Sequence, residues 1–346
     1  MNNKPPLLQT MNLVTGYLSG SKRRIPVAGP LDLQIFAGQL ICLLGSNGSG
    51  KSTLLRTLAG LQPPLEGIMT IAGIPSHQIS SSRLARKISL VLTDSVRSSN
   101  LTVYSLVALG RYPYSNWLGI LRESDQLIIK MAIEATGIED FLDRKVATLS
   151  DGEVQKVMLA RALAQDTPLM MLDEPTAHLD LPSRIQLMRL LHQLARQTDK
   201  GILVSTHELD LALQVADEVW LLQPQTGIGA LLKRGTPEDL VLDGIFGTAF
   251  EKEGIRFDKT TGSFQVHPGN GMLITILGGG AAAFWTKRAV QRLGFSVDEE
   301  RPTALIIRVW EENGKARWAL EQKCGTQSHE TMKSLLEALS LVSPIA

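Results

Sequence analysis

The sequence predicts an α/β fold, a largely parallel sheet covered by helices, followed by a small α+β domain. Three short apolar runs, at residues 40–44, 169–172 and 202–205, are typical of strands buried on both faces of a parallel sheet. A glycine-rich segment follows the first run and leads into a helical pattern at 52–58, which gives the order strand, loop, helix. The length of 346 residues leaves room for a second domain beyond this core.

Two domains are expected, a large one over residues 8–250 and a small one over 255–346. The large domain contains a helical insert at about 94–145, in which Thr102 and Ser124 are predicted to cap two helices. The small domain is expected to contain a strand, a helix, two strands and a helix, at 272–277, 283–293, 305–310, 317–321 and 330–341.

The composition of the chain argues against several classes of protein. Lys and Arg total 35 against 34 Asp and Glu, so the formal charge of +1 argues against a nucleic-acid partner. The two cysteines, Cys42 and Cys324, are far apart and in no metal-ligand spacing, which predicts a reducing, cytoplasmic location. The first residues lack the apolar segment of a secretory signal. The uncharged stretch 262–286 is too rich in glycine and polar residues for a membrane span.

A phosphate-binding loop is predicted between the first apolar run and the helix after it, because the segment matches G-x-x-x-x-G-K-[ST] in that context. Glycines let backbone N–H groups approach a phosphate closely, and the helix N-terminus adds its positive dipole end. Lys51 would neutralise β- and γ-phosphate oxygens of ATP, and Ser52 would ligate Mg²⁺. The alternative is a glycine-rich turn with a solvated lysine. The loop comprises Gly45, Ser46, Asn47, Gly48, Ser49, Gly50, Lys51, Ser52 and Thr53.

Two acidic residues, Asp173 and Glu174, end the apolar run 169–172. Carboxylates at the end of a buried strand are costly unless a cation or a proton compensates them. We expect Asp173 to bind Mg²⁺ and Glu174 to act as the catalytic base that takes a proton from the attacking water. The alternative is a strand end closed by two solvated acids.

The segment Leu149-Ser150-Asp151-Gly152-Glu153, followed by a helix to Ala164, resembles the signature motif of ATP-binding cassette (ABC) proteins. With the two motifs above, the resemblance extends over about residues 8–245. It implies that Tyr17 stacks on adenine, that residues 177–180 form the D-loop with Asp180 near the nucleotide, and that His207 is the catalytic switch histidine.

The signature segment also has a physical interpretation. Ser150 is a good N-cap, and Gly152 leaves the backbone open, so the helix N-terminus offers N–H donors to an anion. In the ABC family this clamp, here Ser150, Asp151, Gly152 and Glu153, serves the ATP of the opposite subunit. A single phosphate loop and a single clamp in one chain therefore imply a homodimer of cassettes.

The sequence departs from the ABC pattern at two places. Thr93 stands where the family has a glutamine near the metal and the attacking water, so Thr93 or the adjacent Asp94 would take that role. Asp151 and Glu153 replace a glycine and a glutamine of the signature, and we expect their carboxylates to point away from the phosphate site.

The segment 109–114, together with the Leu-Ser-Asp-Gly-Glu signature, is similar to ATPases of iron-siderophore, haem and cobalamin importers. This resemblance implies integral-membrane permease subunits as partners, a periplasmic or surface substrate-binding protein acting indirectly, and a peripheral position on the cytoplasmic face of the inner membrane. The alternatives are an ABC exporter ATPase and a non-transport ABC ATPase. The aromatic loop 111–119 is expected to dock the permease, or else to pack locally.

The small domain carries the run Gly278-Gly279-Gly280 between a predicted strand and helix. This pattern is compatible with an anion site at the helix N-terminus or with a tight turn. The resemblance implies a regulatory role or a dimer contact for this domain.

Overall fold

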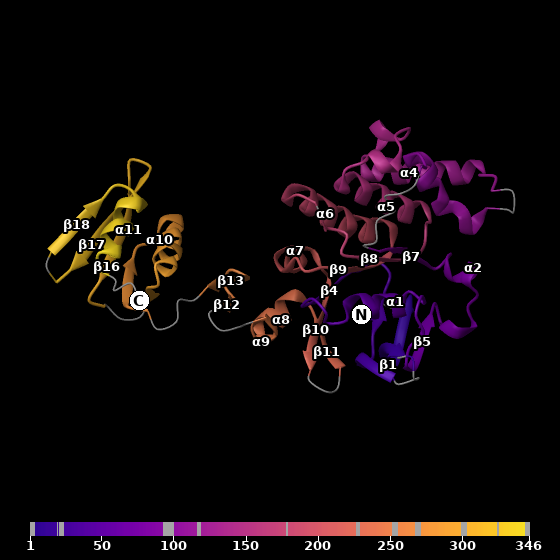
Figure 1. Ribbon diagram of the computed structural model, residues 1–346, viewed down its shortest axis with the longest axis horizontal. Coiled ribbons are helices and arrows are strands. Elements are labelled where there is room, and N and C mark those ends of the chain that lie inside the picture. Colours follow the sequence, from indigo (N-terminus) through magenta and orange to yellow (C-terminus); the bar gives the residue numbers. More distant parts are fainter. Residues whose placement is uncertain are drawn as a thin grey trace. The chain divides into compact units, whose positions relative to one another are not determined.

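A computed structural model describes residues 4–18, 20, 24–92, 100–115, 119–177, 179–225, 229–250, 255–266, 271–298, 303–323 and 325–342. The chain divides into two compact units, Met1–Ile245 and Phe246–Ala346, each with its own sheet (Figure 1).

The first unit is built on one mixed sheet with the strand order β6-β5-β1-β2-β11-β10-β4-β9-β8-β7. The neighbours from β10 to β7 pair in parallel, whereas the β1, β2 and β5 region is antiparallel. The strands are β1 (Leu8–Leu18), β2 (Arg24–Leu31), β3 (Gln34–Ile35), β4 (Leu40–Gly45), β5 (Glu66–Ile71), β6 (Ile74–Pro75), β7 (Ile88–Val91), β8 (Leu169–Asp173), β9 (Gly201–Ser205), β10 (Glu218–Gln225) and β11 (Gly229–Gly235).

The predicted parallel core is confirmed. Every residue of β4, β8 and β9 is buried, as expected for strands covered by helices on both faces. Figure 1 shows α1 (Lys51–Leu58) on one side of these strands and α6 (Leu181–Thr198) with α7 (Leu209–Val215) on the other. Short helices α2 (Ser81–Leu84) and α8 (Pro237–Leu242) complete the periphery.

A helical insert lies between β7 and β8. It contains α3 (Val103–Ala108), the 3-10 helix η2 (Leu109–Tyr114), α4 (Glu123–Thr136), the 3-10 helices η3 (Glu139–Phe141) and η4 (Val146–Thr148), and α5 (Asp151–Ala164). Thr102 caps α3 as predicted, with its Oγ1 accepting from Ser105 N–H at 3.2 Å. The predicted cap at Ser124 is wrong, because α4 starts at Glu123, two residues earlier than a cap at Ser124 would place it. There Arg122 is the N-cap, and its N–H donates to Asp125 Oδ2 at 3.0 Å.

The second unit contains a sheet of order β15-β14-β16-β17-β18 together with α10 and α11. A core of Ile274, Val290, Ile307, Leu320 and Leu335 joins the sheet to these helices. The elements are α9 (Ile245–Phe250), β12 (Ile255–Asp258), β13 (Ser263–Val266), β14 (Leu273–Leu277), α10 (Gly280–Arg292), β15 (Ser296–Val297), β16 (Ile306–Glu312), β17 (Lys315–Gln322), β18 (Gly325–His329) and α11 (Met332–Ser340).

Four strands of this unit were not anticipated from the sequence. The β12–β13 hairpin is held by four phenylalanines that contact one another, Phe246, Phe250, Phe257 and Phe264. β18 is a polar edge strand, and its pairing with β17 decides its conformation. β15 is only two residues long. None of these segments has the apolar run by which the longer strands were recognised.

Candidate nucleotide-binding site

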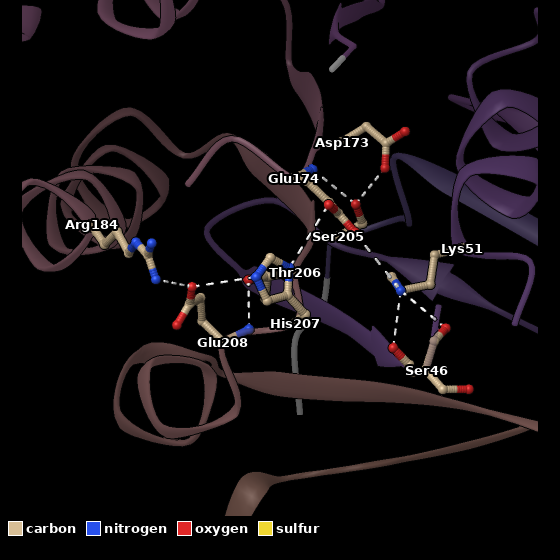
Figure 2. Close-up of polar contacts among 10 residues, drawn as sticks. Ser46, Lys51, Asp173, Glu174, Arg184, Ser205, Thr206, His207 and Glu208 are labelled. Carbon is tan, nitrogen blue, oxygen red and sulfur yellow. Dashed lines mark hydrogen bonds and ion pairs between the residues drawn. The ribbon is translucent and has the colours of Figure 1, made fainter. Parts of the chain in front are cut away.

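Three parallel strands end side by side at one edge of the sheet. β4 leads into the glycine-rich loop, β8 ends at Asp173, and β9 ends at Ser205, which pairs with both Leu43 and Asp173. In open α/β sheets, ligands bind outside the carboxyl ends of such strands. Figure 2 shows Lys51, Glu174 and His207 converging at this edge.

The loop encloses open space. Gly48 and Gly50 have φ angles of 78° and 101°, values that favour glycine. A Cβ added at Gly50 would lie 2.3 Å from Val27 Cγ1, whereas one at Gly48 would meet no atom within 4 Å. The loop borders a cavity of about 510 Å³, lined by Tyr17, Val27, Asn47, Gly48, Gly50, Lys51, Ser52, Thr53 and Glu174.

Lys51 is the buried cation of this cavity, with its side chain 6% exposed. Its Nζ donates to Gly45 O at 2.9 Å and to Ser46 O at 3.3 Å, and it lies 3.9 Å from Glu174 Oε1. Burial lowers the pKa of Lys51, and the nearby Glu174 and Asp173 carboxylates oppose that shift. A polyanionic ligand would supply the compensating charge that the two carbonyl oxygens only partly provide.

The two acidic residues at the end of β8 have different surroundings. Asp173 is 4% exposed, and its Oδ1 accepts from Ser205 Oγ at 2.5 Å. Glu174 adopts a φ of 49°, in the left-handed region that a non-glycine residue rarely occupies. Its N–H donates to both the O and the Oγ of Ser205, each at 3.0 Å. Ser205 therefore fixes the turn that directs Glu174 into the cavity.

The Glu174 carboxylate lies between a cation and an imidazole. Its Oε1 faces Lys51, and its Oε2 is 3.8 Å from His207 Nδ1. His207 is half exposed, and its Nε2 is 3.5 Å from Glu208 Oε1. Glu208 in turn pairs with Arg184. This row of contacts, visible in Figure 2, holds the imidazole beside the carboxylate while leaving it accessible to a ligand.

The residues present fit a magnesium ion. The Asp173 carboxylate and the Ser52 hydroxyl are oxygen ligands of the kind that Mg²⁺ prefers. Mg²⁺ commonly takes one or two protein carboxylates and its remaining ligands from substrate phosphates and water. The buried Ser49 hydroxyl of the loop also lacks a hydrogen-bond partner within the described part of the chain.

The signature residues lie at the N-terminus of α5 and do not line this cavity. Ser150 caps the helix as predicted, because Glu153 N–H donates to its Oγ. That the Asp151 and Glu153 carboxylates point away from the phosphate stays a prediction; in the structure the Glu153 carboxylate contacts Ser150 and Arg144. Its Oε2 accepts from Ser150 N–H at 2.7 Å and Ser150 Oγ–H at 2.9 Å, and its Oε1 accepts from Arg144 Nη1 at 3.0 Å. Asp151 and Gly152 occupy the first turn.

Of the other residues predicted to have a functional role, some line the cavity and some do not. Tyr17 lines the cavity, and its hydroxyl contacts Thr53 Oγ1. Asp180 caps α6 by accepting from Ser183 N–H at 2.9 Å, and it does not line the cavity. Thr93 and Asp94 lie outside the described residues, as does Trp117 of the aromatic loop.

Sequence reasoning missed Ser205 and Arg144. Ser205 ends a predicted strand, so a polar residue at the carboxyl end of an apolar run was the available signal. Arg144 stands six residues before Ser150 in the sequence and carries no motif. Its contact with Glu153 depends on how the insert folds.

A family model described as ABC transporter matches residues 28–177. The achromobactin transport ATP-binding protein of Dickeya dadantii is 36% identical over 243 residues, which cover 70% of this chain and 87% of that protein. The chain belongs to the ATP-binding subunits of ABC transporters. This ABC subunit is thus a nucleotide-binding ATPase, of a family whose cassettes are dimeric and act with membrane permeases.

Two further comparisons concern transport and assembly. The ABC subunit is 34% identical over 268 residues to the cobalamin import ATP-binding protein of Halobacterium salinarum, covering 75% of this chain and 66% of that protein. A dimeric bacterial ABC transporter cassette, MJ0796, superimposes with a TM-score of 0.58 at 25% identity, covering 66% of this chain and 98% of the cassette. These findings confirm the predicted cassette fold.

The C-terminal unit has a family relationship of its own. Residues 270–340 match a model described as the iron ABC transporter C-terminal domain. Within the described part of the ABC subunit, no helix is long and apolar enough to cross a membrane.

Proposed function

We propose that this ABC subunit binds Mg²⁺-ATP in the loop cavity and hydrolyses it with Glu174 as the base. Lys51 and the N–H groups of the loop hold the phosphates, Ser52 and Asp173 hold the metal, and Tyr17 stacks on adenine. The metal would neutralise charge on the β- and γ-phosphates. The main observation that supports this proposal is the position of the Glu174 carboxylate, between the Lys51 ammonium at 3.9 Å and the His207 imidazole at 3.8 Å.

His207 is proposed to hydrogen-bond the γ-phosphate and to position the attacking water. Its half-exposed ring stands on the opposite side of Glu174 from Lys51, so a ligand that meets Lys51 brings its terminal phosphate toward the imidazole. Glu208, held by Arg184, contacts the second ring nitrogen and restricts the orientation of the ring.

The complete site is proposed to require a second copy of the chain. Ser150 and its neighbours at the N-terminus of α5 do not line the cavity that contains Lys51 and Glu174. A clamp on each chain would then close on the ATP of the other, a two-fold arrangement in which both sites form together. The solved cassette with the matching fold is itself a dimer. Asp180, at the start of α6, would lie near the junction.

The transported cargo is proposed to be an iron complex, a siderophore or haem, or cobalamin. The domain match at residues 270–340 and the achromobactin and cobalamin relatives support this class. Uptake would require permease subunits, with a periplasmic or surface binding protein delivering the cargo, and the chain would lie on the cytoplasmic face of the inner membrane. The small domain is proposed to regulate the cassette.

An uptake assay tests the proposed cargo. Cells that carry only a Glu174→Gln form of the chain are given a radiolabelled ferric siderophore, haem or cobalamin, and accumulation is compared with cells that express the unaltered chain. Loss of accumulation of one compound identifies the cargo. Normal accumulation of all three would contradict an import role in this class.

A further inference from the structure

One feature that the nucleotide site does not explain is a cavity in the C-terminal unit, with a volume of about 1030 Å³. It runs beside α10, with walls from β16, β17 and α11. Cavities that hold small organic molecules commonly measure about 300 to 1,000 Å³. The side chains that line it include Trp285, Arg288, Arg292, Glu311, Trp318 and Met332.

The charge of the cavity favours an anion. Arg288 and Arg292 lie one turn apart on α10, so both guanidinium groups face the same side of the helix. Neither has a carboxylate partner within the described residues, whereas Arg308 and Arg317 of the same unit are paired with glutamates. Glu311 is the one acidic residue among the described residues that line the cavity. Two arginines against one glutamate leave a net positive cavity.

The same wall offers aromatic surface. Trp285 is 59% exposed, unusual for so large an apolar side chain. The Arg288 guanidinium lies 5.5 Å from the Trp285 ring centre and 5.4 Å from that of Phe284, which holds this arginine beside the indole. Trp318 of β17 is held against α10, because its indole N–H donates to Thr286 Oγ1 at 2.8 Å. The cavity therefore combines aromatic groups with two arginines that have no carboxylate partner in the described part of the chain.

We propose that this cavity is a binding site for an organic anion that carries a flat aromatic ring. The ring would stack on Trp285, and the anionic group would accept hydrogen bonds from Arg288 and Arg292. Two sources share this chemistry, an aromatic iron chelator of the catecholate class and a nucleotide. The site is separate from the phosphate loop, since all of its lining residues belong to the unit Phe246–Ala346.

The binding test uses the full-length chain carrying Lys51→Ala, so that nucleotide does not occupy the phosphate loop. Isothermal titration calorimetry is performed with 2,3-dihydroxybenzoate, its ferric complex and AMP. We expect at least one of these to bind, and Arg288→Ala or Arg292→Ala to weaken it about tenfold, the effect of losing one charge-assisted hydrogen bond. Trp285→Ala should weaken the same ligand.

The matched control is Lys287→Ala, which removes a cation from the same helix but not from the cavity lining. It should leave the affinity within about twofold of the parent chain. If an alanine variant does not fold, as judged by circular dichroism, Arg288→Gln or Arg292→Gln is used in its place. Glutamine keeps most of the side-chain volume but lacks the charge. The responding probe decides between chelator and nucleotide.

Three outcomes would overturn the proposal. The first is the absence of binding for all three probes at millimolar concentration. The second is binding that the Arg288 and Arg292 variants leave unchanged. The third is equal affinity for acetate, a non-aromatic anion, which would remove the role of the aromatic wall.

Discussion

Glu174 shows how backbone conformation and side-chain position are linked in this site. A φ of 49° is strained for a glutamate, and Ser205 holds it with two hydrogen bonds to one N–H. Strain of this kind persists where the surrounding structure over-determines it, as at sites of catalysis. The turn directs the carboxylate toward Lys51 and His207 and away from Asp173, which stays buried against Ser205.

Glu174→Gln should therefore reduce ATP hydrolysis by roughly 10² to 10⁴ while ATP stays bound, because the amide keeps the shape but cannot take the proton. With ATP and Mg²⁺ the variant should elute as a dimer in size-exclusion chromatography. Adding Ser150→Arg should return it to a monomer, since the arginine would obstruct the clamp. Normal hydrolysis by Glu174→Gln would exclude it as the base.

At the scale of secondary-structure elements, a buried ion pair within the insert joins η2 to α4. Arg111 and Asp125 are 5% and 3% exposed, with Nε and Oδ1 2.8 Å apart. Arg111 Nη1 also donates to Ala164 O at the end of α5, at 3.0 Å, and its guanidinium lies 4.0 Å from the Tyr114 ring centre. These contacts join η2 and α4 to α5, whose N-terminus carries Ser150.

Asp125→Asn should destabilise the chain by roughly 3 to 5 kcal/mol, because Arg111 stays buried without its counter-charge. The hydrogen bond from Arg122 N–H, aided by Arg111, holds the pKa of Asp125 below its ordinary value. Because the pKa of this carboxyl is lower in the folded state, the carboxylate stabilises the folded chain at pH values above the unfolded pKa of about 3.9. This stabilisation is lost as the pH falls through the pKa of the folded state.

The measurement is urea unfolding of the unaltered chain and of the Asp125→Asn variant. Their difference in unfolding free energy should be constant near pH 7 and shrink below about pH 4. Glu134→Gln, which removes an exposed partner of Lys130, is the control and should change stability by less than about 1 kcal/mol. A difference that grows on acidification would refute the assignment.

The aromatic segment of the insert provides a surface for the proposed permease contact. Tyr112 is 75% exposed, and Leu127 and Met131 of α4 are each 60% exposed. Tyr114 instead packs locally, between Arg111 and Arg86, and its hydroxyl donates to Asp166 O at 3.3 Å. Of the two tyrosines in the predicted docking loop, Tyr112 is thus the one available to a partner.

Tyr112→Ala should weaken binding to the permease by at least about tenfold if this residue anchors the contact. The ATP affinity of the subunit should not change, because Tyr112 does not line the loop cavity. Co-purification with the permease in detergent measures the effect. Trp310→Ala, which removes an exposed aromatic of the C-terminal unit, is the control. Full retention of the permease by Tyr112→Ala would show that the contact lies elsewhere.

At the scale of the whole molecule, the nucleotide site and the aromatic cavity belong to different compact units. Every residue proposed to contact ATP lies within Met1–Ile245, and the large cavity lies within Phe246–Ala346. Each unit has its own sheet and its own buried core. Such units are expected to fold with considerable independence.

A chain that ends near residue 253 should consequently fold and keep ATP hydrolysis within about threefold of the full-length rate, since no core residue of the first sheet is removed. Circular dichroism and phosphate release measure these two properties. A folded truncation that has lost nucleotide binding would show that the C-terminal unit belongs to the catalytic core. The truncation is expected to alter the regulation of the cassette or the stability of its dimer, and to lose binding of the aromatic anion.

The sequence by itself determined the features that depend on neighbouring residues. The caps Thr102 and Ser150 were predicted correctly, because a cap bond joins residues three positions apart. The parallel core strands were predicted because continuous apolar runs require burial on both faces.

Only the tertiary structure decided which of these pieces meet. The order of strands places Ser205 beside Asp173, a pairing that joins residues 32 positions apart and that no local pattern encodes. The polar edge strand β18 has the same origin, since its pairing with β17 outweighed local preference. The failed cap at Ser124 differs, because the bond from Arg122 N–H to Asp125 Oδ2 joins residues three positions apart and the local pattern was misread. The cavity beside α10 likewise exists only where separate elements pack, because an enclosed volume depends on the surfaces around it and not on one segment.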